Sequence, residues 1–237
     1  MQKQIKMLIG SHNFGINDAH SDKDYVVFVT PEKEDLYRGT RTNFTKKENG
    51  IEIQYLDYRY FVGSIFKPNF GVFLTLFSKD IESLKYPDSR SFEKWIEKRE
   101  EIAFSGRGKI YSSAKGVFID NMKKLDSYTK TSEWRKDAFG YNTKTAGYAM
   151  LALRVLSRYI DNNFKSFYDA IHLDKKTASE IIAIKNGKYT KEDFIEFAYK
   201  EYDAFKNKYD ESMKKIKAPN LADLQASLDK DFINLIF

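Results

Sequence analysis

The sequence predicts an α+β protein, in which an N-terminal α/β domain (residues 1–105) is followed by a C-terminal helical bundle (residues 106–237). Short segments with the alternating polarity of strands lie in the N-terminal part, whereas apolar residues recur at helical spacing in the C-terminal half. Between the two, Ser105-Gly106-Arg107-Gly108-Lys109 places two glycines close together. We interpret this segment as a linker and domain boundary, because paired glycines are typical of chain that is not in a regular element. The alternative is that the two glycines and two cations wrap a phosphate.

The composition excludes several classes of protein. Of the 237 residues, 42% are hydrophobic, which is enough to form a core. No apolar run approaches the roughly 18 residues that span a membrane, and no signal peptide is recognisable, so we expect a cytoplasmic protein without membrane contact. The absence of cysteine excludes disulfides and thiolate metal sites, and the three histidines make a histidine-rich metal site unexpected.

The positive charge is concentrated in the C-terminal half. Residues 1–105 contain 16 Lys and Arg against 16 Asp and Glu, whereas residues 106–237 contain 24 against 18, which accounts for the whole net charge of +6. A basic half favours an anionic partner such as a nucleotide or nucleic acid. The alternative is that these lysines only solvate the outer faces of helices.

The first chemical pattern is a pair of aspartates at the start of a strand. The apolar segment Met7–Ile9 predicts one strand, and Ser21–Val29 predicts a second strand that begins with Asp22 and Asp24. Residues two apart in a strand project to the same side, so the two carboxylates would converge. Carboxylate oxygens are the ligands that Mg²⁺ prefers, and the pair therefore predicts a magnesium site. The alternative is a solvated pair at a strand edge.

A glycine-serine turn lies between these two strands. Gly10 and Gly15 allow a close approach of the backbone to a ligand, and the exposed N–H groups of such a turn suit an anion. The Ser11 hydroxyl adds a further donor. We therefore predict that Gly10, Ser11 and Gly15 bind phosphate; by themselves they would be an ordinary turn.

Taken together, Gly10-Ser11-x3-Gly15-x5-Ser21-Asp22-x-Asp24 resembles the signature of the DNA polymerase β-like nucleotidyltransferase superfamily. The resemblance implies a mixed sheet and an enzyme that transfers a nucleoside monophosphate from a nucleoside triphosphate to a hydroxyl. It also implies two Mg²⁺ ions held by three carboxylates, the third in a hydrophobic–acid–hydrophobic triplet on a later strand. Further along, Asn69 and Leu76-Phe77-Ser78 resemble predicted nucleotidyltransferases linked to RNA repair in bacteria and phages, which makes RNA or tRNA the expected acceptor.

The third carboxylate implied by the resemblance is Glu52. Residues 50–56 alternate as in a half-buried strand, with Ile51, Ile53 and Tyr55 on one face and Glu52 on the other. Asp57 is the alternative ligand, although its place before the helix predicted at 58–67 suits an N-cap.

The remaining elements are mostly helical. We predict a buried apolar run at 70–78, followed by helices at 90–105, 111–130, 143–161 and 191–217 and a last helix from Leu221. By resemblance, Lys144 at the start of the 143–161 helix would contact the triphosphate, where free N–H groups also favour anions; otherwise it is a surface lysine. Oligomeric state cannot be derived from these patterns.

Two other functions remain open on the sequence alone. The same chemistry could act on a small molecule or a protein hydroxyl, as in antibiotic-modifying or toxin–antitoxin relatives of the superfamily. A catalytically silent nucleotide-binding module is the second alternative, and the three filled carboxylate positions argue against it.

Overall fold

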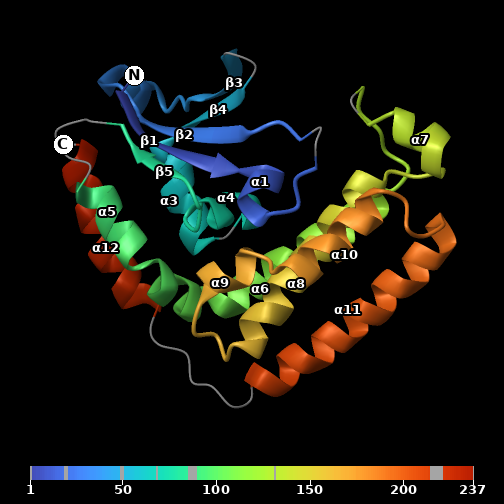
Figure 1. Ribbon diagram of the computed structural model, residues 1–237. Helices are drawn as coiled ribbons and strands as arrows, with labels where there is room; N and C mark the ends of the chain where they lie inside the picture. The colour runs from blue at the N-terminus through green and yellow to red at the C-terminus, as the bar shows by residue number, and fades with distance from the viewer. Residues whose placement is uncertain are drawn as a thin grey trace. The chain divides into compact units, whose positions relative to one another are not determined.

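The computed structural model describes residues 2–18, 21–48, 51–67, 69–84, 90–130, 132–213 and 221–236. It confirms an α+β protein with a mixed sheet in the N-terminal part and a mostly helical C-terminal part (Figure 1). The chain forms two compact units. Unit 1 comprises Met1–Lys109 with Pro219–Phe237, and unit 2 comprises Ile110–Ala218.

The sheet of unit 1 has five strands in the order β3-β4-β2-β1-β5. The strands are β1 (Gln2–Ile9), β2 (Asp24–Thr30), β3 (Asn43–Glu48), β4 (Ile51–Asp57) and β5 (Ile81–Ser83). Only the neighbours β2 and β4 are parallel, and the other three pairs are antiparallel. Strands β2 and β4 therefore begin at the same end of the sheet. The last residue of β1 lies at this end too, beside the first residue of β2.

The two faces of the sheet differ as the alternation in β4 predicted. One face carries a cluster of buried side chains, namely Leu8, Tyr25, Val27, Val29, Ile53 and Tyr55. The opposite face is covered by helix α3 (Tyr58–Phe66), where the rings of Phe28 and Phe61 lie 4.7 Å apart. This second face is also the one to which Glu52 belongs, because it alternates with Ile53.

The other helices of unit 1 are α1 (Gly10–Phe14), α2 (Lys33–Arg38), α4 (Phe70–Thr75), α5 (Arg90–Glu97) and α12 (Leu221–Ile236). The predicted burial of the run at 70–78 is confirmed from Phe73 to Ser78. Helix α12 contacts α5 and so belongs to unit 1, whereas the sequence placed it in the helical domain.

The predicted linker is wrong. Helix α6 (Arg99–Lys123) runs without interruption through Ser105–Lys109, and the chain passes from unit 1 to unit 2 inside it. Each glycine costs a helix roughly 1 kcal/mol. Apolar residues on both sides of the glycines, such as Ile102 and Ile110, are buried and offset that cost. The predicted helix at 90–105 is accordingly two helices, α5 and the first part of α6.

Unit 2 is a helical bundle around α8 (Thr143–Asp161), whose bounds match the prediction. The apolar stripe of α8 is buried throughout, from Ala146 to Ile160. Helices α9 (Phe167–Ile171), α10 (Lys175–Lys185) and α11 (Lys191–Met213) contact it, and α7 (Trp134–Phe139) precedes it. None of the helices in the described part of the chain has the length and apolar character that a bilayer span requires.

Candidate active site at the start of strands β2 and β4

Asp24 and Glu52 are neighbours at the edge where the parallel strands begin. They are paired in the β2–β4 register, and Asp24 is also paired with Ile9 at the end of β1. Paired residues on adjacent strands project to the same face, and adjacent strands lie about 4.8 Å apart. The fold thus brings together two of the three predicted carboxylates, of which Asp24 is partly buried and Glu52 is exposed.

The Asp24 carboxylate lies against the backbone of Gly10. A Cβ atom at Gly10 would lie 3.0 Å from Asp24 Oδ2, and Gly10 has a φ of +71°. Both the close approach and the left-handed conformation require glycine at this position. The predicted glycine-serine turn is in fact the first turn of α1, directly after β1.

Ser11 and Gly15 shape the short helix α1. Ser11 is buried, and its carbonyl accepts hydrogen bonds from the N–H groups of Gly15 and Ile16. Gly15 ends the helix with a φ of +74°. These contacts hold the Gly10–Gly15 segment as one compact loop beside Asp24.

Asp22 lies outside the strand, which corrects the prediction. Strand β2 begins at Asp24, and Asp22 is exposed in the irregular segment before it. The cause is Ser21, whose hydroxyl donates to Asp18 at 2.9 Å and whose carbonyl lies 2.8 Å from His12 Nε2. These contacts bend the chain away from strand geometry. Among the described residues, no three Asp, Glu or His side chains are gathered as a ready-made metal site.

Asp57 is engaged in a different role at the far end of β4. It is buried and caps α3, and it accepts hydrogen bonds from the Arg59 backbone N–H at 2.8 Å and from Arg59 Nη2 at 2.6 Å. Hydrogen bonding to Asp57 raises the pKa of Arg59 in spite of burial. Asp57 is five positions after Glu52 along β4, which corresponds to a distance of roughly 16 Å. The predicted N-cap role is confirmed.

Lys79 is a basic residue near the site that the sequence analysis did not identify. Its backbone N–H donates to the buried amide of Asn13 at 2.9 Å, and its Nζ lies 3.7 Å from the position of a Cβ at Gly15. Ser78 fixes the same turn by donating to the Leu8 carbonyl at 2.8 Å. The Leu76-Phe77-Ser78 motif was the available signal, because it ends directly before this lysine.

Lys144 belongs to unit 2, so its predicted contact with the triphosphate stays a prediction. It is exposed in the first turn of α8, after the N-cap Asn142. Arg154 on the same helix is a structural residue, since it donates to Glu180 at 2.6 Å and 3.0 Å and to Glu201 at 2.5 Å. Burial lowers the pKa of Arg154, but the bonds to both glutamates outweigh it and the pKa is raised.

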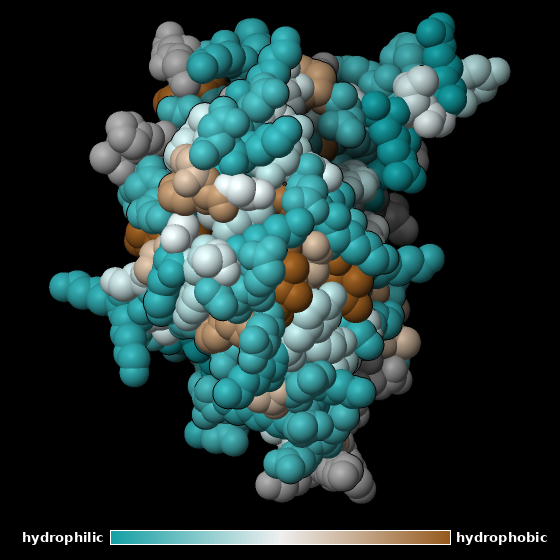
Figure 2. Space-filling model, turned by 90° about the vertical axis from the view of Figure 1, so that its right-hand side faces the viewer, coloured by the Kyte–Doolittle hydropathy of each residue, from teal (hydrophilic) through white to brown (hydrophobic). Residues whose placement is uncertain are grey.

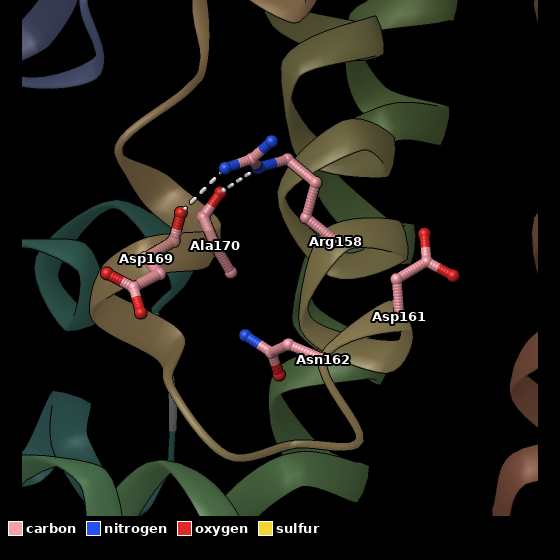
Figure 3. Close-up of a pocket in the computed structure, with 5 residues that line it drawn as sticks. All are labelled: Arg158, Asp161, Asn162, Asp169 and Ala170. Carbon is pink, nitrogen blue, oxygen red and sulfur yellow. Dashed lines mark hydrogen bonds between the residues drawn. The ribbon is translucent and has the colours of Figure 1, made fainter.

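Two pockets lie away from Asp24. One, in unit 2, has a volume of about 360 Å³ and is lined by Arg158, Asp161, Asn162, Asp169 and Ala170 (Figure 3). Its Arg158 guanidinium is engaged by the carbonyls of Asp169 and Ala170, at 2.9 and 3.1 Å. The other pocket, of about 390 Å³, lies between β5 and α5 and includes Ile5 in the middle of β1. Neither pocket contains a predicted site residue.

The comparisons with known proteins add no assignment. Neither the protein-family models nor the curated proteins give a match to this sequence.

Proposed function

We propose that the protein is a nucleotidyltransferase that moves a nucleoside monophosphate from a nucleoside triphosphate to a hydroxyl group. The observation that carries the proposal is the pairing of Asp24 with Glu52 on parallel strands, directly beside the Gly10-Ser11 segment. The two carboxylates lie on one face of the sheet and could bind metal ions. The adjacent glycine-containing segment could bind phosphate, and the reaction needs both functions.

The donor set suits magnesium. Mg²⁺ takes oxygen ligands and usually needs only one or two protein carboxylates, because substrate phosphates and water complete its coordination. Asp24 and Glu52 would supply these carboxylates. Asp22, which is exposed two residues before Asp24, would be the third carboxylate ligand. When bound, two Mg²⁺ ions would supply the positive charge that stabilises the transferring phosphoryl group and the leaving pyrophosphate.

The residues of the chain would position the substrate. The acceptor oxygen attacks the α-phosphorus, the bond from that phosphorus to the β-phosphate oxygen breaks, pyrophosphate leaves, and the hydroxyl proton passes to water. Lys79 lies beside Gly15 and would balance negative charge on the phosphates, together with Ser11 and the backbone of α1. No side-chain nucleophile is required.

We propose an RNA or tRNA end as the acceptor. The support is the distribution of charge, because unit 2 carries the whole net positive charge of the chain. A small molecule or a protein hydroxyl is the alternative acceptor, and the assay below includes each.

The test is transfer of label from α-³²P nucleoside triphosphates with Mg²⁺ to RNA, tRNA, protein and aminoglycoside acceptors in parallel. We expect label on RNA or tRNA, and a loss of about 100-fold or more in Asp24→Asn and in Glu52→Gln. Glu82→Gln is the matched control, because Glu82 is an exposed strand residue whose carboxylate lies 3.3 Å from Lys6 Nζ. Transfer by both site variants at the wild-type rate would refute the proposal.

A further inference from the structure

The positive charge of the chain resides in unit 2. Residues 110–218 contain 21 Lys and Arg against 15 Asp and Glu, whereas the residues of unit 1 contain 19 of each. Several acids of unit 2 are already paired: Glu180 and Glu201 with Arg154, and Asp126 with Lys191. Unit 2 nevertheless contains more cations than acids, so pairing within the unit leaves an excess of positive charge.

Unit 2 also has an exposed tryptophan, in helix α7. Trp134 is 52% exposed, although tryptophan is usually well buried. The Arg135 guanidinium lies 4.4 Å from the centre of its ring. Arg135 is itself buried and fixed, because its Nη1 donates to Thr143 Oγ1 at 2.7 Å and to the Lys185 carbonyl at 2.6 Å. The indole is thus held in place by a cation while more than half of its surface stays open.

A close contact joins α7 to the turn between α10 and α11. The ring of Phe139 lies so near Gly187 that a Cβ there would be 2.3 Å from it. This contact places α7 beside the exposed Lys188, whose Nζ lies 4.9 Å from the centre of the Tyr189 ring. Tyr189 in turn stacks on Phe197 at 5.0 Å. The rings of Trp134 and Phe139, whose centres lie 5.9 Å apart, are therefore next to a turn that carries a lysine and a tyrosine.

We define the α7 face as Trp134, Phe139, Lys188 and Tyr189; Lys136 lies on the same short helix, two residues after Trp134. Lys136 and Lys188 are exposed, and neither forms an ion pair with another described residue. Glu133 and Asp137 also lie at α7 and balance the charges of Arg135 and Lys136, so the net charge of this face comes from Lys188. Figure 2 shows the side of the molecule on which α7, α10 and α11 lie; it is mostly hydrophilic, with small separate apolar areas.

We propose that the α7 face binds single-stranded nucleic acid, with one base stacked on Trp134 and the flanking phosphates near Lys136 and Lys188. Base stacking on an aromatic side chain contributes about 1–3 kcal/mol and needs the unpaired bases of a single strand. Continuous apolar patches of several hundred Å² mark many protein interfaces, whereas the apolar areas on this side are small and separate, which favours a nucleic acid as the partner. The proposal concerns unit 2 and does not depend on the nucleotidyl transfer proposed above.

Tryptophan fluorescence tests the stacking directly. The chain has two tryptophans, and Trp95 is fully buried in unit 1, so Trp95→Phe leaves Trp134 as the only reporter. Titration with single-stranded RNA and with single-stranded DNA of the same sequence shows which backbone is preferred. We expect quenching by at least one single strand and little by the matched duplex. Because Trp95→Phe could fail to fold, anisotropy of a labelled oligonucleotide with the otherwise wild-type protein provides a second measurement.

Variants separate stacking from charge. We expect Trp134→Ala to weaken single-strand binding about 5–100-fold and Trp134→Phe to weaken it less. Lys136→Gln with Lys188→Gln should reduce the salt dependence of binding by about one to two ions. Tyr37→Ala is the aromatic control, since Tyr37 is 92% exposed in unit 1, and Lys200→Gln with Lys206→Gln is the charge control on α11. Both controls should bind as wild type.

Three results would overturn the proposal. Wild-type affinity in Trp134→Ala would exclude stacking, and equal affinity for the duplex would reduce the interaction to attraction between charges. A change of Trp134 emission with protein concentration alone would identify the α7 face as an interface between copies of the chain. Asp24→Asn should bind the oligonucleotide normally, so failure of this proposal and failure of nucleotidyl transfer can be told apart.

Discussion

Asp24 and Gly10 are matched to one another, because the carboxylate of Asp24 occupies the space where a side chain at Gly10 would begin. The distance from Asp24 Oδ2 to that position is 3.0 Å. The aspartate comes from the start of β2 and the glycine from the end of β1, and the antiparallel register places them side by side. The loop and the carboxylate therefore form one site, so a change in either should alter both.

We expect Gly10→Ala to destabilise the protein by about 1–3 kcal/mol, because alanine disfavours a φ of +71° and its Cβ would press on Asp24. The same variant should reduce nucleotidyl transfer, since Asp24 must move. Urea unfolding measures the first effect, and the labelled transfer assay measures the second. Gly63→Ala is the control in α3, where no atom lies within 4 Å of the added Cβ and φ is not positive. It should stabilise by about 0.5–1 kcal/mol. Equal stability of Gly10→Ala and wild type would contradict the close contact.

Asp57 and Glu52 should behave in opposite ways, although both were candidates for the third carboxylate. Asp57→Ala removes the cap of α3 and leaves the Arg59 guanidinium without its carboxylate partner, with only the Thr40 carbonyl as an acceptor among the described residues, which should cost about 2–4 kcal/mol of stability. Glu52→Gln is an exposed change and should alter stability by less than about 0.5 kcal/mol. Transfer activity of the folded fraction should be lost in Glu52→Gln and kept in Asp57→Ala. If fully folded Asp57→Ala protein lost transfer activity, Asp57 would again be a candidate for the third carboxylate.

The elements that the sequence predicts well are those in which local pattern and final burial agree. Strand β4 alternates, so the position of Glu52 opposite Ile53 and Tyr55 followed directly from the spacing. Helix α8 has a complete apolar stripe, and its predicted bounds agree with the structure. In both elements the local apolar pattern coincides with the side that the other elements bury, so the spacing alone predicted it.

The errors occur where contacts distant in sequence decide the local structure. The glycines at 106 and 108 predicted a linker, but burial on both sides keeps α6 helical. Strand β3 has no apolar alternation, because five of its six residues are exposed, and it forms only by pairing with β4. The sequence predicts Asp22 to be in a strand, but Ser21 contacts His12 and Asp18 and this segment is irregular. Such contacts produce no periodic pattern in the sequence from which they could be predicted. The position of Lys79 depends on Ser78 reaching Leu8, which no local pattern reveals.

Gly187→Ala should disturb the attachment of α7. The added Cβ would lie 2.3 Å from the Phe139 ring, at a residue whose φ is +80°, so we expect a loss of about 2 kcal/mol or more in urea unfolding. Phe139→Ala removes the ring and relieves the clash. The double variant should therefore be more stable than the sum of the two single changes by about 1 kcal/mol or more. Gly116→Ala in α6 is the control, because its Cβ meets no atom. Additive effects of the two changes would show that Phe139 does not lie against Gly187.

Tyr141 should make the stability of unit 2 depend on pH in the alkaline range. Burial raises the pKa of Tyr141 from 10.0 to about 12, and its hydroxyl donates to the Tyr189 carbonyl at 3.2 Å. Between these two values the unfolded chain has lost the proton and the folded chain has kept it. The unfolded state then binds fewer protons, so the free energy of unfolding falls as pH rises from 10 toward 12.

Tyr141→Phe removes this titration together with the hydrogen bond. At pH about 8 the variant should be less stable than wild type by about 1 kcal/mol, the usual contribution of such a bond. At pH about 11 the difference should shrink by about 1 kcal/mol, because only the wild type is penalised there. Tyr111, whose pKa burial also raises to about 12, titrates in both proteins and cancels in the comparison. Urea unfolding of both proteins at the two pH values measures the change. If the difference stays constant, the Tyr141 hydroxyl ionises as readily in the folded as in the unfolded chain, and its burial has no energetic consequence.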